Sequence, residues 1–180
     1  DKGWPREGGI RQHAFLAPNY HMTEMQAAVG IAQLRKLPAM VQARRERAQE
    51  LTRLLSDLPG LTLPPDGPEA HHTYWQYPLR VDLSRFGASL AQMGQAIHAE
   101  GIPVNVGYLD MPMYQYETLT QVSGRGGRAL PQRYGPGLCP QAEEVLASLY
   151  VIPWNERYTL QMVADMAAGL RKVFCHYSLS

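Results

Sequence analysis

Apolar residues recur every three or four positions along the stretch that follows Thr23, with polar residues between them. The apolar positions are Met25, Ala28, Val29, Ile31, Ala32 and Leu34. This spacing predicts a helix with one buried face. Thr23 is suited to cap that helix through its hydroxyl, because Gln26 follows three residues later and completes a capping box. The pattern continues to Leu58, and Pro38 is expected either to kink the helix or to begin a second one.

The remaining residues predict a small sheet with helices around it. The expected strands are 73–81, 102–108 and 150–153. Helices are expected over 89–100, over 141–149 and after Thr159. Pro78 interrupts the first strand, which indicates an edge or a bulge. A proline-rich loop over 61–70 and a long loop over 109–139 connect these elements. The predicted fold class is therefore α/β, as an α+β domain with about three strands covered by helices on one side and a long N-terminal linking helix.

The charge balance excludes several classes of partner. The 180 residues carry 17 basic and 16 acidic side chains, a net charge of +1. No electrostatic attraction to nucleic acid or to a membrane follows from this balance. No apolar run is long enough to span a bilayer, and the N-terminus lacks the apolar centre of a signal peptide. The expected location is the cytoplasm, where Cys139 and Cys175 are predicted to be free thiols, with a disulfide as the alternative.

The residues alone indicate no metal or nucleophile. His71 and His72 are adjacent, so on a strand they point to opposite faces and cannot share a metal ion. The other histidines show no ligand spacing, and no Gly-x-Ser-x-Gly motif is present. A glycine-rich basic stretch over 124–128 lacks the ending of a phosphate-binding loop. A flexible loop is the favoured interpretation, and a nucleic-acid-binding loop around Arg125 and Arg128 is the weaker alternative.

The aromatic residues have more than one interpretation. For Tyr74, Trp75 and Tyr77, packing within the sheet is favoured over base stacking. For the tyrosines of the long loop, among them Tyr108 and Tyr114, lining a pocket and ordinary loop packing are equally supported. Without further information, the residue pattern does not determine the function.

Residues 19–34 read Asn-Tyr-His-Met-Thr-Glu-Met-Gln-Ala-Ala-Val-Gly-Ile-Ala-Gln-Leu. This stretch resembles the Asn-Tyr-Arg-Met-Thr/Ser-Glu-x-Gln-Ala-Ala motif of the DegT/StrS sugar aminotransferases, which are pyridoxal-phosphate (PLP) enzymes of fold type I. Later segments also resemble that family, namely 72–81, 100–103, 108–114, 139–143 and 151–159. The resemblance covers 1–180 but concerns only the C-terminal part of such an enzyme.

The resemblance implies a division of the chain and an activity. Residues 1–22 would be the irregular end of a large PLP-binding domain, 23–58 the linking helix and 59–180 the small domain. The parent enzyme would transfer an amino group from glutamate or glutamine to a keto-sugar or ketocyclitol, including nucleotide-linked sugars. It would act as a homodimer.

The family's Schiff-base lysine is expected upstream of the Asn-Tyr motif. The three lysines of the chain, Lys2, Lys36 and Lys172, do not have that context. No catalytic residue is therefore assigned, and this chain alone is expected neither to turn over substrate nor to bind PLP. The alternative is a non-catalytic dimerisation or binding module without a cofactor.

The resemblance also implies individual site residues. Asn19 would reach the cofactor phosphate across the dimer, which agrees with the anion preference of a helix N-terminus. His21 stands where the family motif has arginine, and a neutral imidazole would bind an anion more weakly. Tyr108 and Tyr114 are the candidates for lining the sugar pocket. An exposed apolar surface along Met22, Met25 and Val29 is expected to cause self-association.

Overall fold

The computed structural model describes residues 20–65, 67, 71–109, 111–116 and 135–179, together with the backbone of two short strands. These strands, β1 (Arg6–Glu7) and β2 (Ile10–Arg11), pair in antiparallel fashion. The chain divides into two units, Asp1–Leu37 and Pro38–Ser180. In the described part of the chain, no helix is long and apolar enough to cross a membrane.

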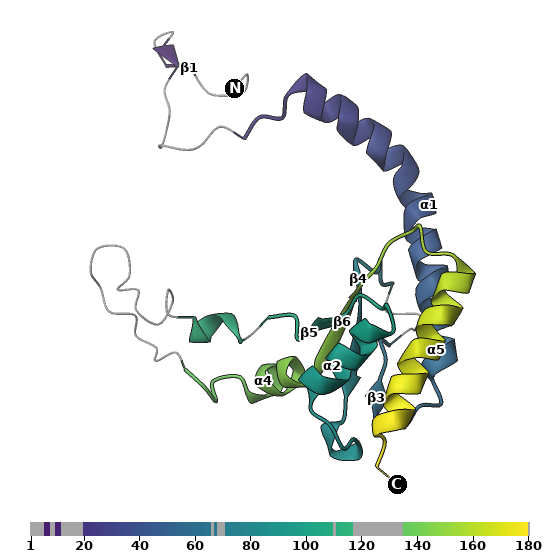
Figure 1. The fold of residues 1–180 in the computed structure, drawn as a ribbon. Coiled ribbons are helices and arrows are strands. Elements are labelled where there is room, and N and C mark those ends of the chain that lie inside the picture. Colours follow the sequence, from purple (N-terminus) through teal and green to yellow (C-terminus); the bar gives the residue numbers. More distant parts are fainter. Residues whose placement is uncertain are drawn as a thin grey trace. The chain divides into compact units, whose positions relative to one another are not determined.

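Helix α1 (Glu24–Leu55) is continuous, so a second helix does not begin at Pro38 (Figure 1). The predicted capping box is present: Gln26 N donates to Thr23 Oγ1 at 3.2 Å, and Thr23 N donates to Gln26 Oε1 at 2.9 Å. Proline cannot donate the N–H that an interior helical position requires. Good helix formers such as alanine, leucine, glutamine and arginine surround Pro38, and their propensity favours continuation.

The sheet has four strands in the order β3-β4-β6-β5, and every neighbouring pair is antiparallel. The strands are β3 (Leu61–Thr62), β4 (Gln76–Val81), β5 (Asn105–Val106) and β6 (Leu149–Pro153). The α/β prediction is confirmed, and the sheet has one strand more than the approximate number expected. The additional strand β3 lies in the segment predicted as a proline-rich loop. The sequence does not indicate it, because two residues are too few to produce a period-two pattern.

Pro78 lies on β4, which is an interior strand and not the predicted edge strand, but β3 is too short to reach Pro78. Val81 N donates to Ser148 O at 2.9 Å, on the side of β6, so the alternate residues Leu79 and Tyr77 direct their N–H groups the same way. The nitrogen of Pro78 therefore faces β3. Strand β3 pairs only with Arg80 and Val81, so no ladder bond is lost at Pro78.

One face of the sheet carries the hydrophobic core. Tyr77, Leu79 and Val81 alternate with more exposed neighbours along β4, and Tyr150 and Ile152 of β6 lie beside them. This inner face packs against the C-terminal half of α1, α2 (Leu90–Ala99) and α5 (Leu160–Tyr177) (Figure 1). The buried hydrophobic residues of these helices are Ala48, Leu51, Leu55, Met93, Ile97, Val163, Met166, Ala167, Leu170, Val173 and Phe174.

Helix α4 (Pro140–Ala147) corrects the expectation that helices cover only one side of the sheet. Arg80 alternates with the core residues of β4 and therefore points to the outer face. Its Nη2 atom donates to Glu144 Oε1 of α4 at 2.9 Å. This ion pair places α4 at the outer face of the sheet, opposite the core.

The remaining local signals agree with the structure. Ser89 and Gln92 form a capping box at the start of α2, and Gly101 follows its end with a φ of +81°. Thr159 caps α5 by accepting a hydrogen bond from Met162 N at 3.1 Å. Cys139 and Cys175 are both exposed and free, which confirms the prediction of thiols. Two short 3-10 helices, Leu83–Arg85 and Met113–Gln115, complete the described elements.

Candidate functional site

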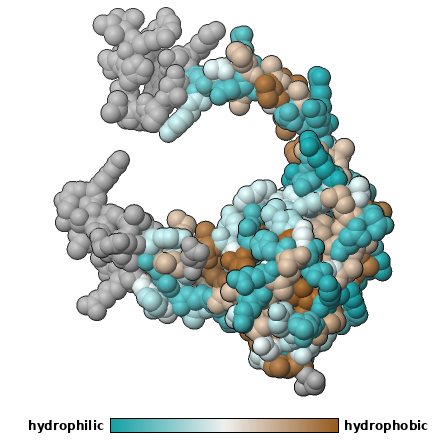
Figure 2. Space-filling model, viewed as in Figure 1, coloured by the Kyte–Doolittle hydropathy of each residue, from teal (hydrophilic) through white to brown (hydrophobic). Residues whose placement is uncertain are grey.

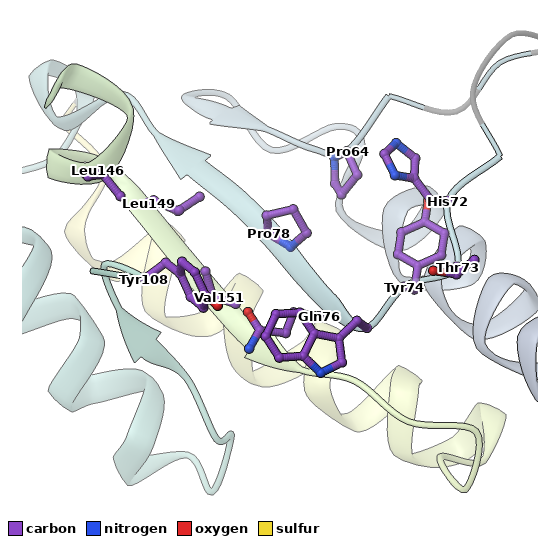
Figure 3. A pocket seen from close by; sticks show the side chains of 11 residues that line it. Pro64, His72, Thr73, Tyr74, Gln76, Pro78, Tyr108, Leu146, Leu149 and Val151 are labelled. Carbon is purple, nitrogen blue, oxygen red and sulfur yellow. The ribbon is translucent and has the colours of Figure 1, made fainter. Parts of the chain in front are cut away.

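A pocket of about 370 Å³ lies on the outer face of the sheet (Figure 3). Pro78 of β4 and Val151 of β6 are direct partners across the two strands, and both line the pocket. Leu146 and Leu149 extend the apolar surface toward α4. The other lining residues are Pro64, His72, Thr73, Tyr74, Trp75, Gln76 and Tyr108.

Tyr108 lines this pocket, as a substrate-lining residue should, and its proposed role stays a prediction. Its ring meets the indole of Trp75 edge to face, with centroids 6.1 Å apart and an interplanar angle of 88°. Trp75, which the residue pattern assigns to sheet packing, is instead 66% exposed. Its place directly before β4 is visible in the sequence, but its orientation toward the pocket is known only from the structure.

Tyr114 lies elsewhere and does not line this pocket. Its hydroxyl donates to Glu143 Oε1 at 2.5 Å and accepts from Cys139 N at 3.2 Å. Partial desolvation, and secondarily the neighbouring carboxylate, raise the pKa of Tyr114. The hydrogen bond from Tyr114, together with one from Gly137 N, lowers the pKa of Glu143. Tyr114 therefore joins the short 3-10 helix over 113–115 to the N-terminal end of α4.

The predicted phosphate contact at the start of α1 is described only in part. Asn19 lies outside the described residues, as do Arg125 and Arg128 of the alternative nucleic-acid loop. His21 is exposed in the segment before α1. The Thr23 hydroxyl already accepts a hydrogen bond from Gln26 N, so it is engaged in capping. The proposed anion-binding role of these residues stays a prediction.

The lining of the outer-face pocket does not by itself fit PLP. The lining of the outer-face pocket contains no lysine or arginine that could hold the cofactor as an imine or bind its phosphate. Lys172 donates from Nζ to Glu100 Oε1 at 2.7 Å, Lys36 lies on α1, and Lys2 is outside the described residues. Among the residues that the structure describes, no group of three or more His, Cys, Asp or Glu side chains could hold a metal ion.

Comparison with known proteins decides the family. Residues 2–171 match the DegT/DnrJ/EryC1/StrS aminotransferase family. The chain belongs to this family. The match runs through the Asn-Tyr motif, the linking helix and all four strands of the sheet, and it confirms the resemblance carried by residues 19–34. One solved structure of similar fold, that of a GDP-4-keto-6-deoxymannose-3-dehydratase, contains a trapped PLP–glutamate geminal diamine.

Two curated relatives show different kinds of likeness. The chain is 50% identical over 56 residues to dTDP-4-dehydro-2,3,6-trideoxy-D-glucose 4-aminotransferase of Saccharopolyspora spinosa, covering 29% of the chain and 14% of that enzyme. It is 26% identical over 172 residues to UDP-4-amino-4,6-dideoxy-N-acetyl-beta-L-altrosamine transaminase of Helicobacter pylori, covering 93% of the chain and 40% of that enzyme. The chain therefore spans less than half the length of either relative.

The fold is also found in solved structures. The aminotransferase from Psychrobacter cryohalolentis superposes with a TM-score of 0.73 at 20% identity, covering 96% of the chain and 44% of that protein. At this identity the likeness concerns the fold alone. The part of the Psychrobacter protein that this chain matches is less than half of that protein's length.

Proposed function

We propose that this chain is the small-domain part of a PLP-dependent aminotransferase that transfers an amino group to a keto-sugar or ketocyclitol. The observation that supports this proposal most directly is the family match over residues 2–171. The chain would contribute the linking helix and the small domain, with 1–22 as the end of the large domain. Glutamate or glutamine would be the amino donor, and the cytoplasm would be the location.

The lysine that carries PLP would come from outside these 180 residues. The cofactor supplies an electron sink and a carrier for the amino group, and the catalytic lysine moves the proton. In the part of the chain that the structure describes, Lys172 is paired with Glu100 and no lysine lines the outer-face pocket. This chain would therefore supply substrate-facing residues and not the catalytic base.

The proposed site residues have separate roles. Asn19 would bind the cofactor phosphate across the dimer, and His21 would give weaker anion binding there than an arginine does. Tyr108 would contact the nucleotide-linked sugar substrate, because it lies at a pocket and is 47% exposed. Tyr114 would affect the same substrate only indirectly, by holding residues 113–115 in place, since its hydroxyl is hydrogen-bonded to Glu143.

Reconstitution tests the proposal. The chain is combined with an upstream domain that carries the Schiff-base lysine, and amination of a nucleotide-linked keto-sugar is assayed with glutamate as donor. Activity is expected only in the mixture, and the chain alone should give no stable imine absorbance with PLP. A mixture in which both parts are folded but no amination occurs would argue against the proposal.

The alternative, a non-catalytic self-associating module, is favoured by one specific observation. Figure 2 shows hydrophobic residues among hydrophilic ones along the N-terminal half of α1. Met22, Met25 and Val29 are 71%, 81% and 62% exposed in the structure. Apolar side chains exposed at helical spacing mark a surface for a partner, and a second copy of this chain is the proposed one.

Sedimentation velocity separates self-association from a monomeric state. The wild-type chain is expected to form a dimer as its concentration rises, and Met25→Glu should shift the equilibrium to the monomer. Leu160→Glu is the matched control, because Leu160 is 59% exposed but lies on α5. A wild-type chain that stays monomeric at high concentration would contradict the proposed dimer, whatever the result of the amination assay.

A further inference from the structure

The outer-face pocket presents two aromatic rings to solvent. Trp75 is 66% exposed and Tyr108 is 47% exposed, and the two rings stand nearly perpendicular. A perpendicular pair forms a corner in which a third flat ring can stack on one face while it meets the edge or face of the other. Pro78 and Val151 close the base of the pocket with apolar atoms. The arrangement favours a planar ligand.

Trp75 and Tyr74 come directly before β4 and do not continue the alternation of its side chains. Side chains alternate along a strand, so with Tyr77 inward and Gln76 outward, Trp75 would be expected inward. Tyr74 has a φ of +47°, a left-handed conformation that side-chain-bearing residues rarely adopt. Tyr74 is buried and stacks on Tyr77, with ring centroids 6.2 Å apart, whereas Trp75 lines the outer-face pocket together with Gln76. Strained backbone of this kind is concentrated at functional sites.

The polar groups of the pocket suit a neutral heterocycle. None of its lining residues is an aspartate, glutamate, lysine or arginine, so the pocket is not built for a phosphate or another ion. The side-chain amide of Gln76 lines the pocket, and Figure 3 shows it directed toward Tyr108 and Val151. An amide offers one acceptor and two donors, which matches the mixed donor and acceptor edge of a nucleobase.

We infer that the outer-face pocket binds the base of a nucleotide, stacked on Trp75 and Tyr108 and hydrogen-bonded by Gln76. This inference rests on the proposed function, since the base would be that of a nucleotide-linked sugar substrate. A volume of about 370 Å³ is at the lower end of the range for small-ligand sites, which suits a base with part of its ribose. The phosphates and the sugar would extend outside the pocket.

Binding of uridine monophosphate and thymidine monophosphate to the 180-residue chain tests the site. Each is titrated and followed by ¹H–¹⁵N NMR, and saturable shifts are expected at Gln76, Trp75 and Tyr108. Trp75→Ala should weaken binding by about tenfold or more, and Trp75→Phe by no more than about threefold, because a phenyl ring retains stacking. Circular dichroism verifies that the variants fold. Met162→Ala, an exposed residue on α5 away from the pocket, is the control that should leave affinity unchanged.

Three results would each overturn the inference. The first is equal affinity of the wild-type chain and Trp75→Ala for both nucleotides, and the second is no saturable binding by the wild-type chain. The third is displacement of the nucleotides by inorganic phosphate alone, which would identify an anion site and not a base site.

The reconstituted enzyme separates this inference from the proposed function. There Trp75→Ala is expected to raise the KM for the nucleotide-linked keto-sugar by about tenfold while kcat changes little. Amination with an unchanged KM would reject the base pocket and leave the aminotransferase proposal standing. Nucleotide binding that depends on Trp75, without any amination, would support the pocket and reject the proposed function.

Discussion

The Tyr114 hydroxyl donates a hydrogen bond of 2.5 Å to Glu143 Oε1 and thereby joins two segments that are 29 residues apart in sequence. Glu143 Oε1 also accepts hydrogen bonds from Gln115 Nε2 at 3.0 Å and from Gly137 N at 2.8 Å. A charged acceptor makes stronger hydrogen bonds than a neutral one. Glu143 therefore holds residues 114–115 and 137 together, and Tyr114 extends this connection to Cys139 N.

Glu143→Ala is expected to release this connection. Amide hydrogen exchange at Gly137 should accelerate about fivefold or more, because its N–H loses a charged acceptor. Glu143→Gln keeps one acceptor oxygen and should have a smaller effect. Tyr114→Phe should accelerate exchange at Cys139 while Gly137 keeps its acceptor.

Glu144→Ala is the control for these variants, since this adjacent carboxylate pairs with Arg80 instead. Exchange at Gly137 that is the same in Glu143→Ala and in the wild-type chain would contradict the role of Glu143. The pKa of Glu143 is lowered by its hydrogen bonds. These hydrogen bonds should therefore persist at pH values above the ordinary carboxyl pKa and weaken as the pH falls below that value.

Asp57 should make stability depend on pH in the acid range. Its two carboxylate oxygens accept from Arg171 Nη1 and Nη2 at 2.5 and 2.7 Å, and these bonds lower the pKa of Asp57 to about 2. A lowered pKa in the folded state stabilises it above the unfolded pKa, 3.8, and this contribution is lost as pH falls toward 2. The wild-type Tm should therefore exceed that of Asp57→Asn near neutral pH, and the difference should shrink below pH 3.8 and vanish only below about pH 2.

Thermal unfolding of both proteins across this pH range measures the effect. Asp165→Asn is the matched control, because Asp165 is a carboxylate on α5 whose partner is the neutral amide of Gln161. A difference between wild type and Asp57→Asn that is constant with pH would show that Asp57 acts through packing and not through its charge.

Gly94→Ala should destabilise the fold although alanine is the better helix former. A Cβ at Gly94 would lie 2.4 Å from Val106 Cγ2, and the β-branched side chain of Val106 has little freedom to move. Helix propensity favours alanine by about 1 kcal/mol, but overpacking is expected to cost more, leaving a net loss of about 1–2 kcal/mol in urea denaturation.

The second variant removes the obstacle. Val106→Ala should restore most of the free energy of unfolding that Gly94→Ala loses, which is the non-additivity expected of residues in contact. Gly30→Ala is the control in α1, where a Cβ would meet no atom within 4 Å and the substitution should be neutral or stabilising. Equal losses in Gly94→Ala with and without Val106→Ala would exclude this contact as the cause.

Thr23→Ala should fray the first turn of α1. The hydroxyl that accepts from Gln26 N is lost, at a cost of about 1 kcal/mol to the helix terminus. Hydrogen exchange at Gln26 should accelerate, whereas Thr23→Ser should preserve the wild-type rate. Unchanged exchange in Thr23→Ala would show that the cap contributes nothing to the helix start.

Local signals in the sequence located most of the elements. The capping boxes at Thr23 and Ser89 and the glycine at 101 depend on neighbouring residues only, so the pattern of residue types predicts them correctly. Strand β3 and the placement of α4 on the outer face escaped prediction. A two-residue strand exists because β4 is beside it, and α4 is held by Arg80, so both depend on contacts distant in sequence.

The sequence by itself determined the family resemblance, the α/β class and the free thiols, because motifs, periodicity and composition are properties of the chain. Only the tertiary structure decided which aromatic residues lie in the core and which face solvent. Tyr74 and Tyr77 are buried, whereas Trp75 lies beside Tyr108 in the outer-face pocket. The reason is physical: Trp75 precedes β4 and is not bound by the alternation of its side chains, while the ring of Tyr74, whose φ is positive, packs on Tyr77 in the core.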